Sequence, residues 1–117
     1  MEEVLRLAIS EVVNKLGYGF NENIYEEPLA YVLRGKGYNI KTQVKRDVYF
    51  DNKELLGSVR LDMIIDEGKA IVEMKSTSNS LSTKDINQVK AYKKVTEVEE
   101  AYIVFVSDCH SGAFRVL

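Results

Sequence analysis

The chain has 117 residues, 45% of them hydrophobic and 29% charged, which is ordinary for a small globular protein. We therefore expect residues 1–117 to form one domain with a modest core. The net charge of −2 and the pI of about 5.5 exclude a dedicated polybasic nucleic-acid binder, but they are compatible with a carboxylate-rich site that holds a cation.

Cysteine content and hydropathy indicate in which cellular compartment the protein is expected. The single cysteine, Cys109, cannot form an intrachain disulfide, which suits a reducing compartment. The N-terminus has no basic segment followed by an apolar stretch, and no apolar run approaches the roughly 20 residues of a membrane span. We expect a cytoplasmic protein that does not contact a membrane.

Two helices are predicted in the first third of the chain. Apolar residues at helical spacing predict a helix over residues 3–16, which ends at a glycine-containing stretch. A second helix is predicted over residues 22–34, followed by Gly35. Pro28 lies inside it, where a proline costs about 3 kcal/mol. We therefore expect either a bend at Pro28 or a helix that begins near Tyr25.

The rest of the chain alternates strands with one helix. Strands are predicted where apolar residues alternate or run continuously, over 43–50, 55–66, 69–75, 101–107 and 114–117. The continuous run at 101–107 predicts a strand buried on both faces. Ser82 and Asp85 form a capping-box pattern, which predicts a helix from there to about residue 95. The predicted order is α-α-β-β-β-α-β-β, an α/β (α+β) arrangement.

Two carboxylates and a lysine are the strongest candidates for a catalytic site. Glu73 and Lys75 flank one residue of a predicted strand, so their side chains project to the same face. If residues 55–66 and 69–75 pair as a hairpin, Asp62 comes alongside them. Carboxylates hold a hard cation, and a lysine steadies an attacking water or developing charge, as phosphodiester hydrolysis requires. The structural alternatives are a salt bridge from Asp62 to Arg60 or Lys75, and an internal Glu73–Lys75 ion pair.

A set of short motifs extends this pattern over residues 10 to 107. They are, in order, Gly19-Phe20-Asn21-Glu22-Asn23-Ile24-Tyr25, Arg60-Leu61-Asp62, Val72-Glu73-Met74-Lys75 and Gln88-Val89-Lys90-Ala91-Tyr92. The ordered set resembles the PD-(D/E)XK nuclease superfamily and, within it, the family named for the pattern G-x-x-E-x-x-Y. The resemblance implies a restriction-endonuclease-like core, in which helices flank a mixed central sheet.

The resemblance also implies roles for individual residues. A metal would lie at a bend between the second and third strands, with Asp62 and Glu73 as ligands and the Met74 carbonyl as a third. Lys75 would be the catalytic lysine, and Glu22 an additional acidic ligand or a residue that positions water. An acidic residue at a helix N-terminus is also favoured by the helix dipole, which is the alternative for Glu22.

Four further residues are expected beside the substrate. Gln88 and Tyr92 match a Q-x-x-x-Y pattern whose members face the site in related nucleases and orient the lysine or the substrate. The alternatives are a surface position for Gln88 and a core position for Tyr92. Ser76 and Thr77 follow Lys75 directly and are expected to contact a backbone phosphate.

These patterns predict a nuclease that depends on Mg²⁺ or Mn²⁺, with DNA as the expected substrate. A non-catalytic nucleic-acid- or protein-binding module on the same fold is the alternative, and a structural protein with a fortuitous charge cluster is a third. We also expect a homodimer, because a short chain has a modest core and sheet edges are usually covered. The apolar N-terminal helix and a strand edge are the expected contacts.

Overall fold

The structure is a computed structural model that describes residues 1–76 and 81–117. The elements in these ranges are α1 (Glu2–Leu16), α2 (Glu22–Gly35), β1 (Ile40–Phe50), β2 (Glu54–Ile65), β3 (Ala70–Ser76), α3 (Thr83–Thr96), β4 (Glu100–Val106) and β5 (Ser111–Val116). This is the predicted order, so the expected α+β arrangement is confirmed. No helix in the described ranges is both long and apolar enough to cross a membrane.

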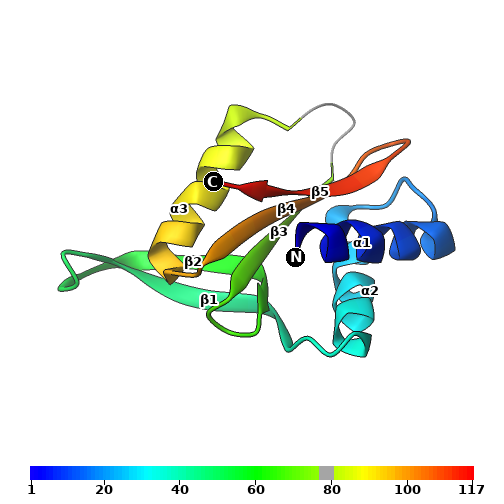
Figure 1. Ribbon diagram of the computed structural model, residues 1–117. Helices are drawn as coiled ribbons and strands as arrows, with labels where there is room; N and C mark the ends of the chain where they lie inside the picture. The colour runs from blue at the N-terminus through cyan, green and yellow to red at the C-terminus, as the bar shows by residue number, and fades with distance from the viewer. Residues whose placement is uncertain (77–80) are drawn as a thin grey trace.

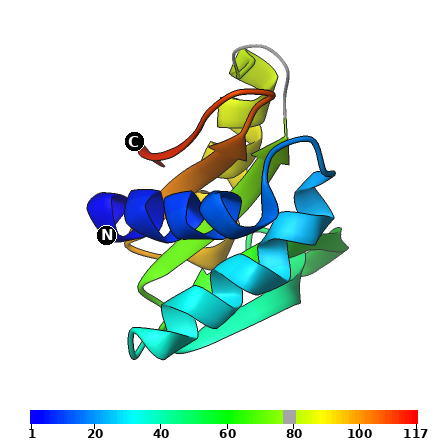
Figure 2. The same cartoon turned by 90° about the vertical axis from the view of Figure 1, so that its right-hand side faces the viewer.

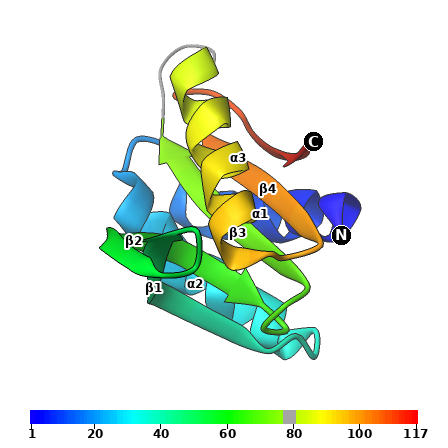
Figure 3. The same ribbon diagram turned by 90° about the vertical axis from the view of Figure 1, so that its left-hand side faces the viewer.

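The strands form one mixed sheet in the order β1-β2-β3-β4-β5 (Figure 1). Neighbouring strands are antiparallel except β3 and β4, which run parallel and are connected through α3. A parallel pair needs such a crossover, because a short turn cannot return the chain to the same end of the sheet. The helices α1 and α2 cover one face of the sheet (Figure 2), and α3 covers the other (Figure 3).

The described residues form a hydrophobic cluster on each face of the sheet. The cluster under α1 and α2 takes Val72 and Met74 from β3, whereas the cluster under α3 takes Ile71. Strand β4 divides in the same way and is almost wholly buried, so the prediction of a strand covered on both faces is confirmed. The centre of the sheet is thereby fixed from both sides, and the site is built on β3.

Helix α2 begins at Glu22, as the predicted range 22–34 has it, so the alternative of a start near Tyr25 is not observed. The helix continues through Pro28, although proline removes a backbone donor there. Before the proline, the fully buried Tyr25 donates its hydroxyl to the Gly17 carbonyl at 2.8 Å and accepts from the Phe20 amide at 3.2 Å. These contacts fix the loop before the helix and hence the position of Glu22.

Candidate active site

The candidate site lies where β2 and β3 separate. Their backbone ladder includes Met63 opposite Val72, and the next residues along it are Asp62 and Glu73. From here on, side-chain carboxylates and not backbone carbonyls accept the hydrogen bonds between the two strands. The Asp62 amide donates to Glu73 Oε1 at 3.1 Å, and the Met74 amide donates to Asp62 Oδ2 at 2.8 Å. The structure therefore brings both carboxylates to one point between the diverging strands.

At Asp62 the side chains of β2 stop alternating regularly between the two faces of the sheet. Met63 packs in the cluster under α1 and α2, whereas Leu61 packs in the cluster under α3. Residues two apart in a regular strand share a face, so alternation is interrupted at Asp62. Gln43, between the partners of Leu61 and Met63 on β1, has a φ of 53°, a left-handed conformation uncommon for a residue other than glycine. The irregularity turns Asp62 out of the ladder and toward β3.

Burial and charge repulsion give Glu73 an unusual proton affinity. Its side chain is 4% exposed. Burial, followed by the negative charge of Asp62, raises the pKa of Glu73 from 4.5 to about 8, and Lys75 opposes this increase. Two carboxylates this close favour a shared proton or a shared cation, because either one relieves their repulsion.

Helix α3 holds the lysine. Lys75 Nζ donates to Gln88 Oε1 at 2.8 Å and lies 3.6 Å from Asp85 Oδ1. Gln88 Nε2 in turn donates to the Tyr92 hydroxyl at 3.3 Å. Tyr92 is also packed against the cluster under α3, so it has a core contact and a site contact together.

Asp85 is a site neighbour that the motif analysis did not assign. It completes the capping box of α3, in which the Asp85 amide donates to Ser82 Oγ at 3.2 Å and the Ser82 amide donates to Asp85 Oδ2 at 3.1 Å. The hydrogen bond from the Ser82 amide, with a smaller contribution from Lys75, lowers the pKa of Asp85. Asp85, which caps the first turn of α3, thus also positions Lys75.

Helix α2 approaches from the opposite face of the sheet. Glu22 Oε2 accepts a hydrogen bond from the Ser76 amide at 3.1 Å, and Ser76 Oγ donates to the Phe20 carbonyl at 3.4 Å. Glu22 is therefore tied to the residue after Lys75. Thr77, the other expected phosphate contact, lies outside the described residues.

A second glutamate of α2, Glu26, was missed by the sequence analysis. It is 7% exposed, and Gln43 Nε2 donates to its two carboxylate oxygens at 3.0 and 2.9 Å. Burial raises the pKa of Glu26, the hydrogen bond from Gln43 opposes this, and the charge of Asp62 adds to the increase. One signal was available, since Glu26 interrupts the apolar face that Tyr25 and Leu29 define on α2.

The structural alternatives for the carboxylates can be compared with these contacts. No ion pair in the described part of the chain includes Asp62 or Glu73. Lys75 is paired with Asp85 instead. Backbone amides of β2 and β3 hold the two carboxylates, and Lys75 acts on Glu73 through its charge without forming an ion pair with it.

The donor chemistry of the site fits a hard divalent cation. Asp62, Glu73 and the Met74 carbonyl present oxygen atoms, which Mg²⁺ and Mn²⁺ prefer. Within residues 1–76 and 81–117, no three histidine, cysteine, aspartate or glutamate side chains converge closely enough to form a cage. Mg²⁺ usually needs no such cage, because one or two carboxylates hold it while water and substrate phosphates complete its coordination.

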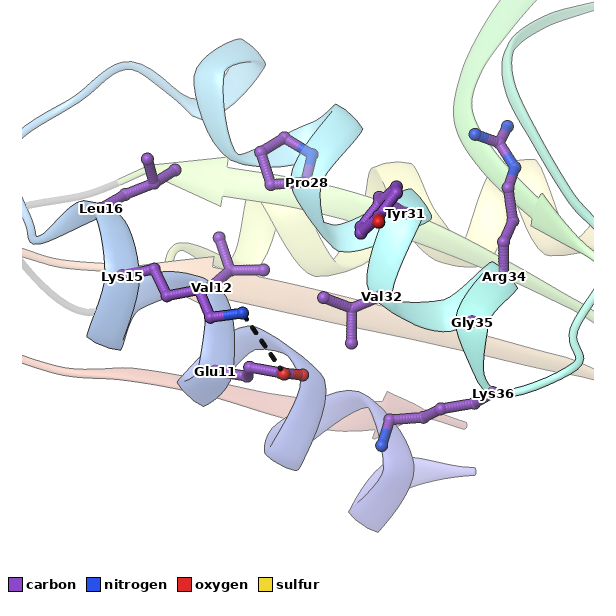
Figure 4. Close-up of a pocket in the computed structure, with 10 residues that line it drawn as sticks. All are labelled: Glu11, Val12, Lys15, Leu16, Pro28, Tyr31, Val32, Arg34, Gly35 and Lys36. Carbon is purple, nitrogen blue, oxygen red and sulfur yellow. Dashed lines mark ion pairs between the residues drawn. The ribbon is translucent and has the colours of Figure 1, made fainter.

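A pocket of about 950 Å³ lies elsewhere, between α1 and α2 (Figure 4). Apolar side chains dominate its lining, among them Val12, Leu16 and Val32. Glu11 and Lys15 form an ion pair at 3.8 Å on its wall. The pocket contains none of the motif residues.

Comparisons with known proteins agree with the fold and identify a family. The sequence model of the PD-(D/E)XK nuclease superfamily matches residues 1–116. A crystal structure of SSO0001 superposes with a TM-score of 0.63 at 18% identity, covering 80% of this chain and 48% of SSO0001. The chain thus corresponds to about half of SSO0001, and at this identity the likeness shows a common fold. No curated protein matches the sequence significantly.

Proposed function

The chain belongs to the PD-(D/E)XK nuclease superfamily, and from this premise we propose that it is a metal-dependent nuclease whose substrate is DNA. The observation that carries the proposal is the reciprocal contact between Asp62 and Glu73, with Lys75 held beside them by Gln88. Three costly polar groups are kept together at one break in the sheet. Burying such groups is unfavourable unless they are paired or bind an ion.

We assign Asp62, Glu73 and the Met74 carbonyl as ligands of Mg²⁺ or Mn²⁺, with Glu22 as a further ligand or a holder of water. A bound cation supplies positive charge to the phosphate and lowers the pKa of a coordinated water. The protein itself contributes position. The Met74 amide holds Asp62, and the Asp62 amide holds Glu73, so both carboxylates are oriented before substrate binds.

Lys75 is the proposed catalytic lysine. Its ammonium group orients the attacking water or stabilises the charge that develops on the phosphate. Gln88 accepts a hydrogen bond from Lys75, and Tyr92 accepts one from Gln88, so this chain of contacts restricts the lysine to one orientation. Ser76 and Thr77, which follow Lys75, are proposed to contact the substrate backbone.

We also assign the chain to the G-x-x-E-x-x-Y family within the superfamily. The three fixed residues, Gly19, Glu22 and Tyr25, have a common structural role here. Tyr25 anchors the loop, Gly19 adopts a φ of 103°, and Glu22 reaches the Ser76 amide. The pattern thus fixes an acidic residue beside the end of β3.

The expected homodimer remains a proposal. The surface that fits it is the apolar pocket between α1 and α2, where the adjacent Tyr31 is 79% exposed. A two-fold pairing would cover this face and leave the carboxylate site open. Light scattering at high micromolar concentration tests it, and a monomer mass would contradict it.

The test of the proposed function is cleavage of single-stranded, duplex and branched DNA, with RNA counterparts, in Mg²⁺, Mn²⁺ or EDTA. We expect cleavage by the wild type in either metal and none in EDTA. Lys69→Ala, an exposed lysine at the turn before β3, is the matched control for Lys75→Ala. Metal-independent binding without cleavage of any substrate would favour the binding-module alternative.

A further inference from the structure

Two cations oppose each other directly across β1 and β2. Lys45 is the register partner of Arg60, and both side chains are exposed. Like charges at directly opposite positions destabilise a strand pair. Among the residues that the structure describes, neither cation forms an ion pair. The fold therefore keeps an unfavourable pair without an evident structural gain.

This pair lies on the part of the β1–β2 hairpin that extends past β3. We call residues 44–61 the arm; it projects from the sheet as a two-stranded ribbon (Figures 1 and 3). The packing of neighbouring arm residues shows to which face of the sheet Lys45 and Arg60 project. Val44, Val59 and Leu61 contact the cluster under α3, so Lys45 and Arg60, which alternate with them, project from the opposite face.

The opposite face is the one that α2 covers, and it carries the α2 glutamates Glu22 and Glu26. Gln43 reaches Glu26 on this face. Arg60 precedes Asp62 by two residues, a distance of about 7 Å along a strand. About two nucleotides span that length, at about 3.4 Å of rise each. The cations therefore lie where they can reach a phosphate about two nucleotides from the carboxylates.

The negative charge around the site suggests a function for the Lys45–Arg60 pair. A polyanionic substrate is repelled by four nearby carboxylates, those of Glu22, Glu26, Asp62 and Glu73. A nuclease with a net charge of −2 must therefore concentrate its cations at a few positions beside the site. Asp47 is the nearest carboxylate further out on this side of the arm, and it forms no ion pair in the described part of the chain.

We propose that Lys45 and Arg60 bind a backbone phosphate about two nucleotides from the bond that is cleaved. This inference rests on the proposed function, because it makes the arm part of the substrate site. An arginine guanidinium can bind a phosphate through two parallel hydrogen bonds, and the lysine adds a point charge beside it. The phosphate would replace like-charge repulsion within the arm by attraction, so binding would also stabilise the arm.

The test measures DNA affinity and stability in the same variants. A short fluorescein-labelled DNA duplex is titrated in EDTA, so that no cleavage occurs, with Lys45→Gln, Arg60→Gln and the double variant. Each phosphate contact contributes about 0.9 to the slope of log K against log salt for duplex DNA. We expect the double variant to lose a slope of about 0.9, because both cations contact one phosphate, while Lys69→Gln, which removes one charge far from the arm, keeps the wild-type slope.

Urea unfolding supplies the second readout. We expect both single variants to be at least as stable as the wild type, because each removes the repulsion between the two cations. Weaker DNA binding together with equal or higher stability identifies a binding role. If the double variant matches Lys69→Gln in slope, or if Arg60→Gln lowers stability as a structural residue would, the inference is overturned.

The outcome separates this inference from the proposed function. A wild type that cleaves DNA, with arm variants that bind and cleave equally well, overturns the inference alone. A wild type that binds DNA but never cleaves it contradicts the proposed nuclease and the placement of the arm beside a cleaved bond. A wild type that does neither overturns both.

Discussion

Helices α2 and α3 approach the same site from opposite faces of the sheet with opposite charge. Within its bounds, α2 carries three glutamates against one arginine, whereas α3 carries four lysines against one aspartate. Their net charges are therefore −2 and +3. A chain whose total is only −2 has thus separated its charges by element, which the overall composition conceals.

The end of β3 connects the two helices. Successive strand residues point to opposite faces, so Lys75 reaches Gln88 on α3 while the next residue, Ser76, meets Glu22 of α2. The difference between the helices indicates a division of work. In the proposed function, Asp62 and Glu73 hold the cation, with Glu22 and Glu26 adding negative charge from α2, and Lys75 with its α3 contacts acts on the phosphate. Each prediction below perturbs one side and compares it with the other.

The largest effect is expected from the strand residues themselves. Asp62→Ala and Lys75→Ala should each reduce metal-dependent cleavage by a factor of about 10²–10³ or more, the loss typical of one preorganised charged group. Excess Mn²⁺ should partly restore Asp62→Ala, because the lost group is a ligand, and should not restore Lys75→Ala. Cleavage of labelled DNA measures both, with circular dichroism to show that the variants fold. Full activity in Lys75→Ala would contradict the mechanism.

Variants on the two helices should affect different quantities, metal affinity for α2 and cleavage rate for α3. Glu26→Gln removes a charge that faces Asp62 and should weaken Mn²⁺ binding by about 10–100-fold, as loss of an outer carboxylate does. Gln88→Ala releases Lys75 and should slow cleavage while Mn²⁺ binding stays at the wild-type level. Calorimetric titration with Mn²⁺, beside cleavage rates at saturating metal, distinguishes them. Equal losses of metal affinity in the two variants would remove the proposed division.

The carboxylates Glu73 and Glu26 should make the stability of the metal-free protein depend on pH. Because the pKa of Glu73 is raised from 4.5 to about 8, the folded protein holds a proton between these values that the unfolded chain has lost. Stability therefore falls as the pH rises through this window, and Glu26, whose pKa is also raised, acts in the same direction. Urea unfolding in EDTA measures it, and Glu73→Gln should flatten the decline. A wild type that gains stability from about pH 5 to 8 would contradict the assignment.

The smallest effect concerns how each helix begins. Ser82 caps α3 through a capping box, whereas Asn21 at the same position of α2 makes no side-chain cap hydrogen bond. Ser82→Ala should therefore cost about 1 kcal/mol of unfolding free energy. Asn21→Ala should stay within about 0.5 kcal/mol, as a surface change does. Urea unfolding of both variants at one pH provides the comparison, and equal losses would show that the cap of α3 is not the source of the difference.

The sequence by itself determined the order of elements and the central chemical groups. Periodicity, the capping box at Ser82 and the turns are local signals, so they survive without knowledge of the fold. Strand parity placed Glu73 and Lys75 on one face, whereas Gln88 was expected at the site from the resemblance to the Q-x-x-x-Y pattern. The inferences from periodicity and parity needed only residues close in sequence.

Tertiary structure decided what depends on register and burial. The exchange of amides between Asp62 and Glu73 needs two strands that separate at one residue, and no local pattern specifies where a ladder ends. Glu26 lies beside the site because its carboxylate accepts hydrogen bonds from Gln43 on another element, and α2 continues through Pro28 although proline disfavours a helix interior. The opposition of Lys45 and Arg60 likewise exists only in the paired hairpin. Such contacts join residues far apart in the chain, so only the folded arrangement sets their energies.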